Sequence, residues 1–114
     1  SCDIIFQWDS SGVCMGFFSC KNCERIRNFF ENLLDQLPNH QDDQYCANHL
    51  LRHEYKDLNV GIFDENIYTI GMNHPMYSRG MSIKIPSNWK AFHANFTQSL
   101  QDKTDLLHAV SSLV

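Results

Sequence analysis

The sequence predicts an α/β fold in which a mixed sheet is flanked by helices. Two apolar segments near the start of the chain, 2–7 and 13–20, have the length and composition of buried strands. The segment 21–37 then repeats large apolar residues at helical spacing. Strand-like and helix-like segments continue to follow one another to the end of the chain, which is the order expected of a layered α/β or α+β fold.

The size and charge of the chain narrow the classes of protein to consider. It has 114 residues, of which 43% are hydrophobic, so it fits one compact domain over residues 1–114. Its formal net charge is −4 and no two basic residues are adjacent, which argues against binding to a nucleic-acid backbone. No apolar run approaches the roughly 18 residues of a membrane-spanning helix, so no membrane span is expected.

The first half of the chain has the clearest local signals. The segment WDSSG between the two strands is rich in residues that favour turns. Gly16 interrupts the second strand, where it indicates a close approach by another group. The segment 21–37 is predicted as an amphipathic helix that ends before Pro38.

The second half alternates shorter elements. Acidic residues suit the start of a helix, so the segment 39–53 is predicted as a second helix. The remaining elements are predicted in this order: strands at 58–64 and 66–70, a loop at 71–80, a strand within 83–96 and an amphipathic helix at 100–114.

The segment AFHANFT (91–97) alternates polar and apolar residues. In an extended strand, this alternation places His93 and Asn95 on one face and Phe92 and Phe96 on the other. A histidine within a strand is more often a hydrogen-bonded core residue than a ligand. The pair is therefore either a hydrogen-bonded part of the core or one edge of a binding site.

The cysteines offer a second pattern. An odd number of them, five, in a chain rich in Phe does not suggest a disulfide scaffold, so reduced thiols are expected. Cys20-x2-Cys23 and Cys46-x2-His49 nevertheless form a Cys3His set suited to zinc. Cys23 and Cys46 also fall in amphipathic helices, where a small apolar residue would serve equally well. A non-catalytic binding or adaptor domain, stabilised by zinc, is the alternative to an enzyme.

Several polar residues have both a structural and a chemical interpretation. Asp3, at a strand end, is either a solvated terminus or an oxygen ligand for Mg²⁺ or Mn²⁺. Asp43 and Gln44 either begin a helix or lie at a pocket edge, where a carboxylate can take a proton or bind a sugar hydroxyl. Lys103 either reaches a phosphate or lies on a helix surface.

The order of these segments resembles the nucleotide-diphospho-sugar transferases of the GT-A glycosyltransferase fold, in particular the group related to plant cell-wall xylosyl- and arabinosyltransferases. The segments that carry the resemblance are CDIIFQWD, MGFFSCK, FFENLL, DDQ followed by NHLL, and FHANFT followed by DK. That group has an Asp-x-Asp motif, an Asn-x-Gly-Phe-Phe strand, an Asp-Gln pair at a helix start, and a late His-Ala-Asn-Trp motif with a downstream Lys. The resemblance covers nearly the whole chain.

The resemblance implies a role for individual residues. Asp3 and His93 match metal ligands, so Mn²⁺ or Mg²⁺ is expected as a Lewis acid on the departing diphosphate. Gly16 matches a glycine that lets the substrate approach the strand. Asn95 and Lys103 match residues of the donor site, with Lys103 as a phosphate contact.

The Asp-Gln pair is expected near the donor sugar and the acceptor. Asp43 is then the candidate base, or the carboxylate that orients the acceptor, and Gln44 is its neighbour in the catalytic site. The chain departs from the family pattern at three positions. Ser1 replaces the first Asp of the metal motif, Cys14 replaces Asn, and Phe96 replaces Trp.

The resemblance implies transfer of a sugar from a nucleoside-diphosphate sugar to a glycan or another hydroxyl acceptor. In this family a Rossmann-like half before the metal motif holds the nucleoside, and the chain does not contain that half. The chain is therefore expected to be the C-terminal part of a GT-A domain, on the metal and acceptor side, and to require an upstream nucleotide-binding half. The alternative is a remnant of such an enzyme that no longer binds sugar nucleotide well.

Overall fold

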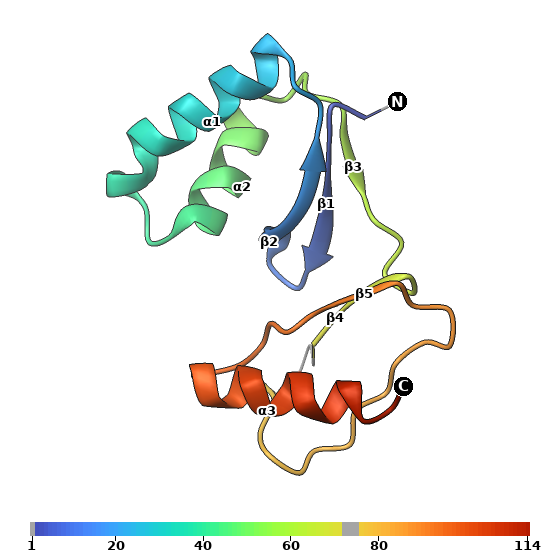
Figure 1. Cartoon of the computed structure of the whole chain (residues 1–114). Helices are drawn as coiled ribbons and strands as arrows, with labels where there is room; N and C mark the ends of the chain where they lie inside the picture. The colour runs from blue at the N-terminus through green and yellow to red at the C-terminus, as the bar shows by residue number, and fades with distance from the viewer. Residues whose placement is uncertain (1, 72–75) are drawn as a thin grey trace. The chain divides into compact units, whose positions relative to one another are not determined.

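The computed structural model describes residues 2–71 and 76–114, and it has a mixed α/β architecture (Figure 1). The α/β prediction is confirmed at this level. Two compact units, Ser1–Phe63 and Asp64–Val114, have their own cores and are described separately. The prediction of one domain over 1–114 stays a prediction, because a compact unit is not the same as an independently folding domain.

The first unit contains a three-stranded sheet in the order β2-β1-β3. Its elements are β1 (Ile4–Asp9), β2 (Gly12–Cys20), α1 (Glu24–Gln36), the short helix η1 (Leu37–Asn39), α2 (Asp43–His53) and β3 (Val60–Ile62). β1 pairs with β2 in antiparallel and with β3 in parallel orientation, so the sheet is mixed. The two long helices lie together beside the hairpin of β1 and β2 (Figure 1).

The core of the first unit lies between the sheet and the helices. Alternate residues of β1, Ile4 and Phe6, are buried, and they belong to one cluster with Phe29 and Leu33 of α1 and Leu50 of α2. These helical residues recur at the spacing of one helix face, which is why the amphipathic pattern predicted the helices correctly. The burial of large apolar side chains is the main force that holds the layers together.

The two helices begin slightly later than predicted. α1 starts at Glu24, after Cys23, and ends at Gln36; η1, which contains Pro38, follows directly. α2 starts at Asp43 because Asp42 caps it: the Asp42 carboxylate accepts a hydrogen bond of 2.7 Å from the backbone N–H of Tyr45. Asp42 therefore caps the N-terminus of α2, and Asp43 lies in its first turn.

The pairing of β1 with β2 shifts within the hairpin. Phe6 faces Phe18, but the next residue, Gln7, faces Cys14, so β2 contains a bulge that includes Gly16. Gly16 is exposed. The hairpin closes at Gly12, whose φ of +139° favours glycine.

The second unit has fewer helices and strands than the first among the described residues. β4 (Tyr68–Ile70) and β5 (Ala91–His93) form a parallel pair, and α3 (Leu100–Ser111) follows with Ser99 as its N-cap. Its core contains Tyr77, Ala94, Leu106 and Val110. Several apolar residues of the predicted C-terminal helix are exposed instead, namely Leu100, Leu107, Leu113 and Val114. None of the helices within the described ranges is long and apolar enough to cross a membrane.

The prediction of a strand through AFHANFT is wrong beyond His93. β5 ends at His93, the Asn95 N–H donates to the His93 carbonyl at 2.9 Å, and Phe96 has a φ of +56°. The chain therefore turns, and His93 and Asn95 do not share one strand face. The segment 83–90 is irregular as well. Of the loop predicted at 71–80, residues 72–75 lie outside the described residues.

The turn has a physical cause. The Asn95 Oδ1 accepts a hydrogen bond of 2.9 Å from the backbone N–H of Gly71, and the Phe96 carbonyl accepts one of 2.8 Å from Tyr77. An asparagine side chain that bonds to backbone competes with strand pairing, which explains why the alternation ends here.

Candidate functional site

A hydrogen-bond network joins the tip of the hairpin to the start of α2. Asp9, the last residue of β1, is only 7% exposed. Its Oδ1 accepts from the backbone N–H and the hydroxyl of Ser11, each at 2.8 Å, and its Oδ2 accepts from the Gln44 Nε2 at 2.8 Å. A buried carboxylate is costly unless such donors surround it. The network therefore gives Gln44 a defined orientation.

Asn48, one turn further along α2, makes a second connection to β2. Its Oδ1 accepts from the Val13 N–H at 2.9 Å, and its Nδ2 donates to the Val13 carbonyl at 3.0 Å and to the Gln44 carbonyl at 2.8 Å. The carboxamide thus satisfies both backbone groups of Val13, as a neighbouring strand would do. Gly12 lies so close to this carboxamide that a Cβ atom at Gly12 would overlap it.

These connections form one wall of an open pocket of about 290 Å³ in the first unit. The pocket is lined by Ser11 of the hairpin, by Asp42, and by Gln44, Tyr45, Asn48 and Arg52 of α2. Its volume is close to the lower end, about 300 Å³, of typical small-molecule pockets. A single sugar ring or a group of similar size fits this space.

The pocket wall offers an aromatic ring beside polar groups. Tyr45 is 60% exposed, so its ring is available to a ligand. Asn48 and Gln44 carry side-chain amides. The guanidinium group of Arg52 can donate several hydrogen bonds, and the carboxylate of Asp42 can accept them. An aromatic surface next to hydrogen-bonding planar groups suits a ligand with an apolar face and several hydroxyls.

Of the two residues of the Asp-Gln motif, Gln44 lines the pocket and Asp43 does not. Gln44 lines the pocket, and the Met15 N–H donates to its Oε1 at 3.4 Å. Asp43 is exposed in the first turn of α2, and its Oδ1 accepts from the Gln44 N–H at 2.8 Å. Asp43 is not among the residues that line the pocket.

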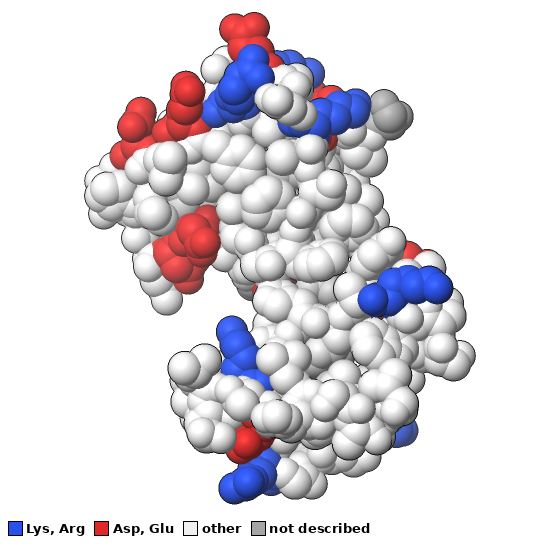
Figure 2. Space-filling view, viewed as in Figure 1, with Lys and Arg blue, Asp and Glu red and all other residues white. Residues whose placement is uncertain are grey.

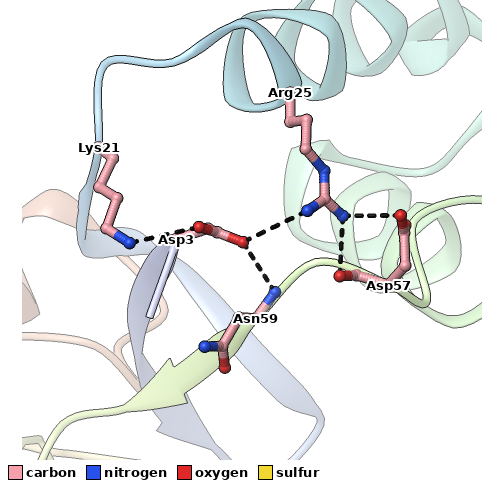
Figure 3. Close-up of polar contacts among 5 residues, drawn as sticks. All are labelled: Asp3, Lys21, Arg25, Asp57 and Asn59. Carbon is pink, nitrogen blue, oxygen red and sulfur yellow. Dashed lines mark hydrogen bonds and ion pairs between the residues drawn. The ribbon is translucent and has the colours of Figure 1, made fainter. Parts of the chain in front are cut away.

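Asp3 lies among cations (Figure 3). Its Oδ1 is 3.4 Å from the Lys21 Nζ, and its Oδ2 is 3.8 Å from the Arg25 Nη1 and accepts from the Asn59 N–H at 3.1 Å. The hydrogen bond from Asn59 holds the pKa of Asp3 below its ordinary value, with Lys21 and Arg25 acting in the same direction and partial burial opposing them. Arg25 is bound in turn to Asp57, at 2.7 Å between Nη2 and Oδ2.

This environment does not fit a metal ligand at Asp3. Two positive side chains beside the carboxylate repel a divalent ion, and both oxygens already have partners. The contacts instead connect β1 to α1 and to the segment before β3, so Asp3 fits a structural role. On the face drawn in Figure 2, several lysine and arginine side chains lie next to aspartate or glutamate, other charged side chains stand alone, and uncharged residues cover most of the surface.

His93, Asn95 and Lys103 belong to the second unit. His93 ends β5, and its carbonyl accepts from the Gly71 N–H at 2.8 Å. The Asn95 Nδ2 is buried and has no hydrogen-bond partner among the described residues. Lys103 is exposed on α3. Asp3, Gly16, Asp43 and Gln44 belong to the first unit, so the predicted site residues are divided between the two units.

The four residues of the zinc alternative do not form a cluster. Cys46 is fully buried, and its Sγ lies 3.7 Å from the Leu33 carbonyl, whereas Cys20 is exposed. Over residues 2–71 and 76–114, no group of three or more His, Cys, Asp or Glu is arranged to hold a metal ion. The Cys3His pattern is therefore not assembled, and the buried cysteine serves as a small core residue.

Sequence patterns singled out Gln44, but they did not reveal its partner Asp9 or the pairing of Asn48 with Val13. Asp9 is separated from Gln44, and Val13 from Asn48, by 35 positions, and no local period connects such residues. One available signal was the segment DSSG, because an Asp before Ser often bonds the backbone of its own turn. The pocket face of α2 offered another signal, since Tyr45 and Arg52 fall outside its apolar stripe.

Comparison with known protein families, curated proteins and solved structures gave no match to this chain.

Proposed function

We propose that the chain is part of a glycosyltransferase that transfers a sugar from a nucleoside-diphosphate sugar to a hydroxyl acceptor. The observation that carries the proposal is the polar pocket of the first unit, because Gln44, the glutamine of the Asp-Gln motif, lines it and is held by Asp9. The order of the other motif segments along the chain supports the same family. The GT-A fold stays part of this proposal.

In this proposal, the pocket holds a sugar ring, of either the donor or the acceptor. The exposed ring of Tyr45 covers the apolar face of the sugar, Arg52 donates hydrogen bonds to its hydroxyls, and Asp42 accepts one from them. Gln44 cannot rotate freely, because its Nε2 and Oε1 both have partners in the hairpin. Such fixed polar groups orient a ligand for reaction.

The roles of other predicted residues remain predictions. Asp43 is exposed next to Gln44, where a carboxylate can accept a proton from an acceptor hydroxyl at the rim of the pocket. Dependence on Mn²⁺ or Mg²⁺ also stays a prediction. Because the surroundings of Asp3 do not fit a metal ligand, no step of transfer is assigned to an ion at Asp3.

Ligand binding followed by NMR tests the proposal. A panel of nucleoside-diphosphate sugars and of free sugars is titrated into the chain, with and without Mn²⁺, and backbone amide shifts are recorded. We expect the largest shifts at Ser11 and along the pocket face of α2. Tyr45→Ala should weaken binding about tenfold, equal to about 1.4 kcal/mol.

Trp8→Ala is the matched control, because Trp8 is another exposed aromatic residue of the first unit and does not line the pocket. It should leave the affinity unchanged. Release of nucleoside diphosphate, measured for each donor with a mixture of sugar acceptors, tests the reaction itself. If no donor and no free sugar shifts the pocket residues, the proposed function is wrong, because all the residues that line the pocket belong to this chain.

A further inference from the structure

Three histidines gather in the first unit beside the pocket. The ring centroids of His40 and His49 are 5.0 Å apart, and those of His49 and His53 are 4.6 Å apart. His49 and His53 both line the pocket. The glycosyltransferase proposal assigns none of these residues a role, so the cluster needs its own explanation.

The positions of the rings follow from local structure. His49 and His53 are four residues apart on α2, so their side chains lie on one face, one turn above the other. His40 follows η1, and its N–H donates to the Leu37 carbonyl at 3.1 Å. Its ring is near both His49 and Tyr45, with a centroid distance of 5.8 Å to Tyr45. His40 therefore packs beside the helical pair.

The imidazoles of the helical pair are available for a ligand. Within the described residues, neither His49 nor His53 has a side-chain hydrogen bond. Two histidines four residues apart on a helix can donate two ring nitrogens to one ion. Imidazole suits Zn²⁺, Cu²⁺ and Ni²⁺, whereas Mg²⁺ and Mn²⁺ prefer oxygen ligands.

We propose that His49 and His53 together bind one transition-metal ion of the zinc, copper or nickel type at the wall of the pocket. The site has two protein ligands, so it is consistent with the finding that no larger group of metal-binding side chains is assembled among the described residues. Water fills the remaining coordination positions, which face the pocket. The proposal does not depend on the glycosyltransferase function.

The charges around the pair partly favour a cation. Asp42 lines the same pocket. Glu54 follows His53, and its two carboxylate oxygens accept hydrogen bonds from the Asn32 Nδ2 at 2.9 Å and from the Gln36 Nε2 at 3.0 Å. Two carboxylates, those of Asp42 and Glu54, thus belong to the surroundings of the pair. They oppose the positive charge of Arg52, which also lines the pocket.

Paramagnetic Ni²⁺ locates the site directly. The whole chain, with its imidazoles labelled with ¹⁵N, is titrated with Ni²⁺ in the presence of a reductant that does not bind metals. We expect the ring signals of His49 and His53 to broaden before that of His108 on α3 and before the amides of Cys20 and Cys23. Zn²⁺ should displace the nickel, and Mg²⁺ should not.

Substitutions then measure the contribution of each ligand. His49→Gln and His53→Gln should each weaken Ni²⁺ binding at least tenfold. His108→Gln is the control, because His108 is an exposed histidine on α3. Earlier broadening at His108, Cys20 or Cys23 than at the His49 and His53 rings, displacement by Mg²⁺, or unchanged affinity in both variants would overturn the proposal. If a variant fails to fold, the broadening pattern of the unsubstituted chain still decides.

Discussion

The Gln44 Nε2 donates a hydrogen bond of 2.8 Å to the buried Oδ2 of Asp9, across 35 positions of sequence. This bond connects the end of β1 to the first turn of α2. It compensates the buried carboxylate and at the same time fixes a side chain of the pocket wall. Stability and the geometry of the pocket therefore depend on the same contact.

Removal of this amide should destabilise the first unit. Gln44→Ala leaves the Asp9 Oδ2 without the donor that the structure shows, and the expected loss in the free energy of unfolding is about 1–3 kcal/mol. Urea denaturation followed by circular dichroism measures it. Gln41→Ala is the control, since Gln41 is exposed just before the helix. Equal stability of the two variants would show that the network does not stabilise the fold.

The close approach of Gly12 to Asn48 gives a second prediction. Gly12→Ala should destabilise the protein by more than about 1 kcal/mol, because a Cβ there overlaps the Asn48 carboxamide and the residue has a φ of +139°. Gly80→Ala separates the two causes. Gly80 has a φ of +86°, but a Cβ added to it would meet no atom within 4 Å. Thermal unfolding of both variants should show the larger loss for Gly12→Ala.

A Gly12→Ala variant no less stable than Gly80→Ala would contradict the contact with Asn48. The double variant Gly12→Ala, Asn48→Ala extends the test. If the overlap is the main cause, the cost of Gly12→Ala should be smaller when Asn48 has already been removed.

Local patterns predicted most elements, but not the long-range contacts that form the pocket wall. Ile26, Phe29 and Leu33 recur along one face of α1, and this repeat is a property of the segment itself. Asp42 likewise signals a helix start within a few residues. The bond between Asp9 and Gln44, in contrast, exists only after the hairpin and α2 have packed together.

The failure at AFHANFT has the same origin. Over seven residues, alternation of polar and apolar residues does not distinguish a strand from a turn. Which of the two forms depends on a partner that is distant in the sequence. Here the Asn95 side chain bonds to Gly71, 24 positions away. The metal-binding role predicted for Asp3 has the same weakness. Its place at a strand end is visible in the sequence, but its partners Lys21 and Arg25, which decide what the carboxylate can bind, are not.

The pKa of Asp3 predicts a dependence of stability on pH. The Asn59 N–H, together with Lys21 and Arg25, lowers this pKa in the folded protein. The folded state therefore binds the proton less strongly than the unfolded state, whose aspartate pKa is about 3.9. The stabilisation is present above that value and is lost as the pH falls through the lower pKa of the folded protein.

Asp3→Asn should remove this contribution, so the stability of the variant should fall less steeply between about pH 5 and pH 2. Asp35→Asn is the control, because Asp35 is exposed on α1. Denaturation midpoints measured across this pH range for the three proteins give the comparison. Parallel curves for the Asp3→Asn variant and the unsubstituted chain would mean that the Asp3 contacts do not persist in solution.

The reactivity of the cysteines tests the arrangement of the core. Burial raises the pKa of Cys46 and of Cys14. At Cys14, hydrogen bonds with the backbone of Gly16 and Phe17 lower the pKa and so partly oppose the effect of burial. Because the thiolate is the reactive form, both should react slowly with iodoacetamide at neutral pH. Cys2 and Cys20 are exposed, so they should be alkylated first.

Mass spectrometry of the protein after timed alkylation gives the order of reaction. Addition of Zn²⁺ before iodoacetamide makes the experiment decisive for the cysteine pattern. If Cys20, Cys23, Cys46 and His49 formed a zinc site, the ion would protect Cys20 and Cys23 together with Cys46. The structure predicts instead that Cys20 stays reactive with zinc present, since Cys46 lies fully buried against the Leu33 carbonyl and is not available to share a metal with it.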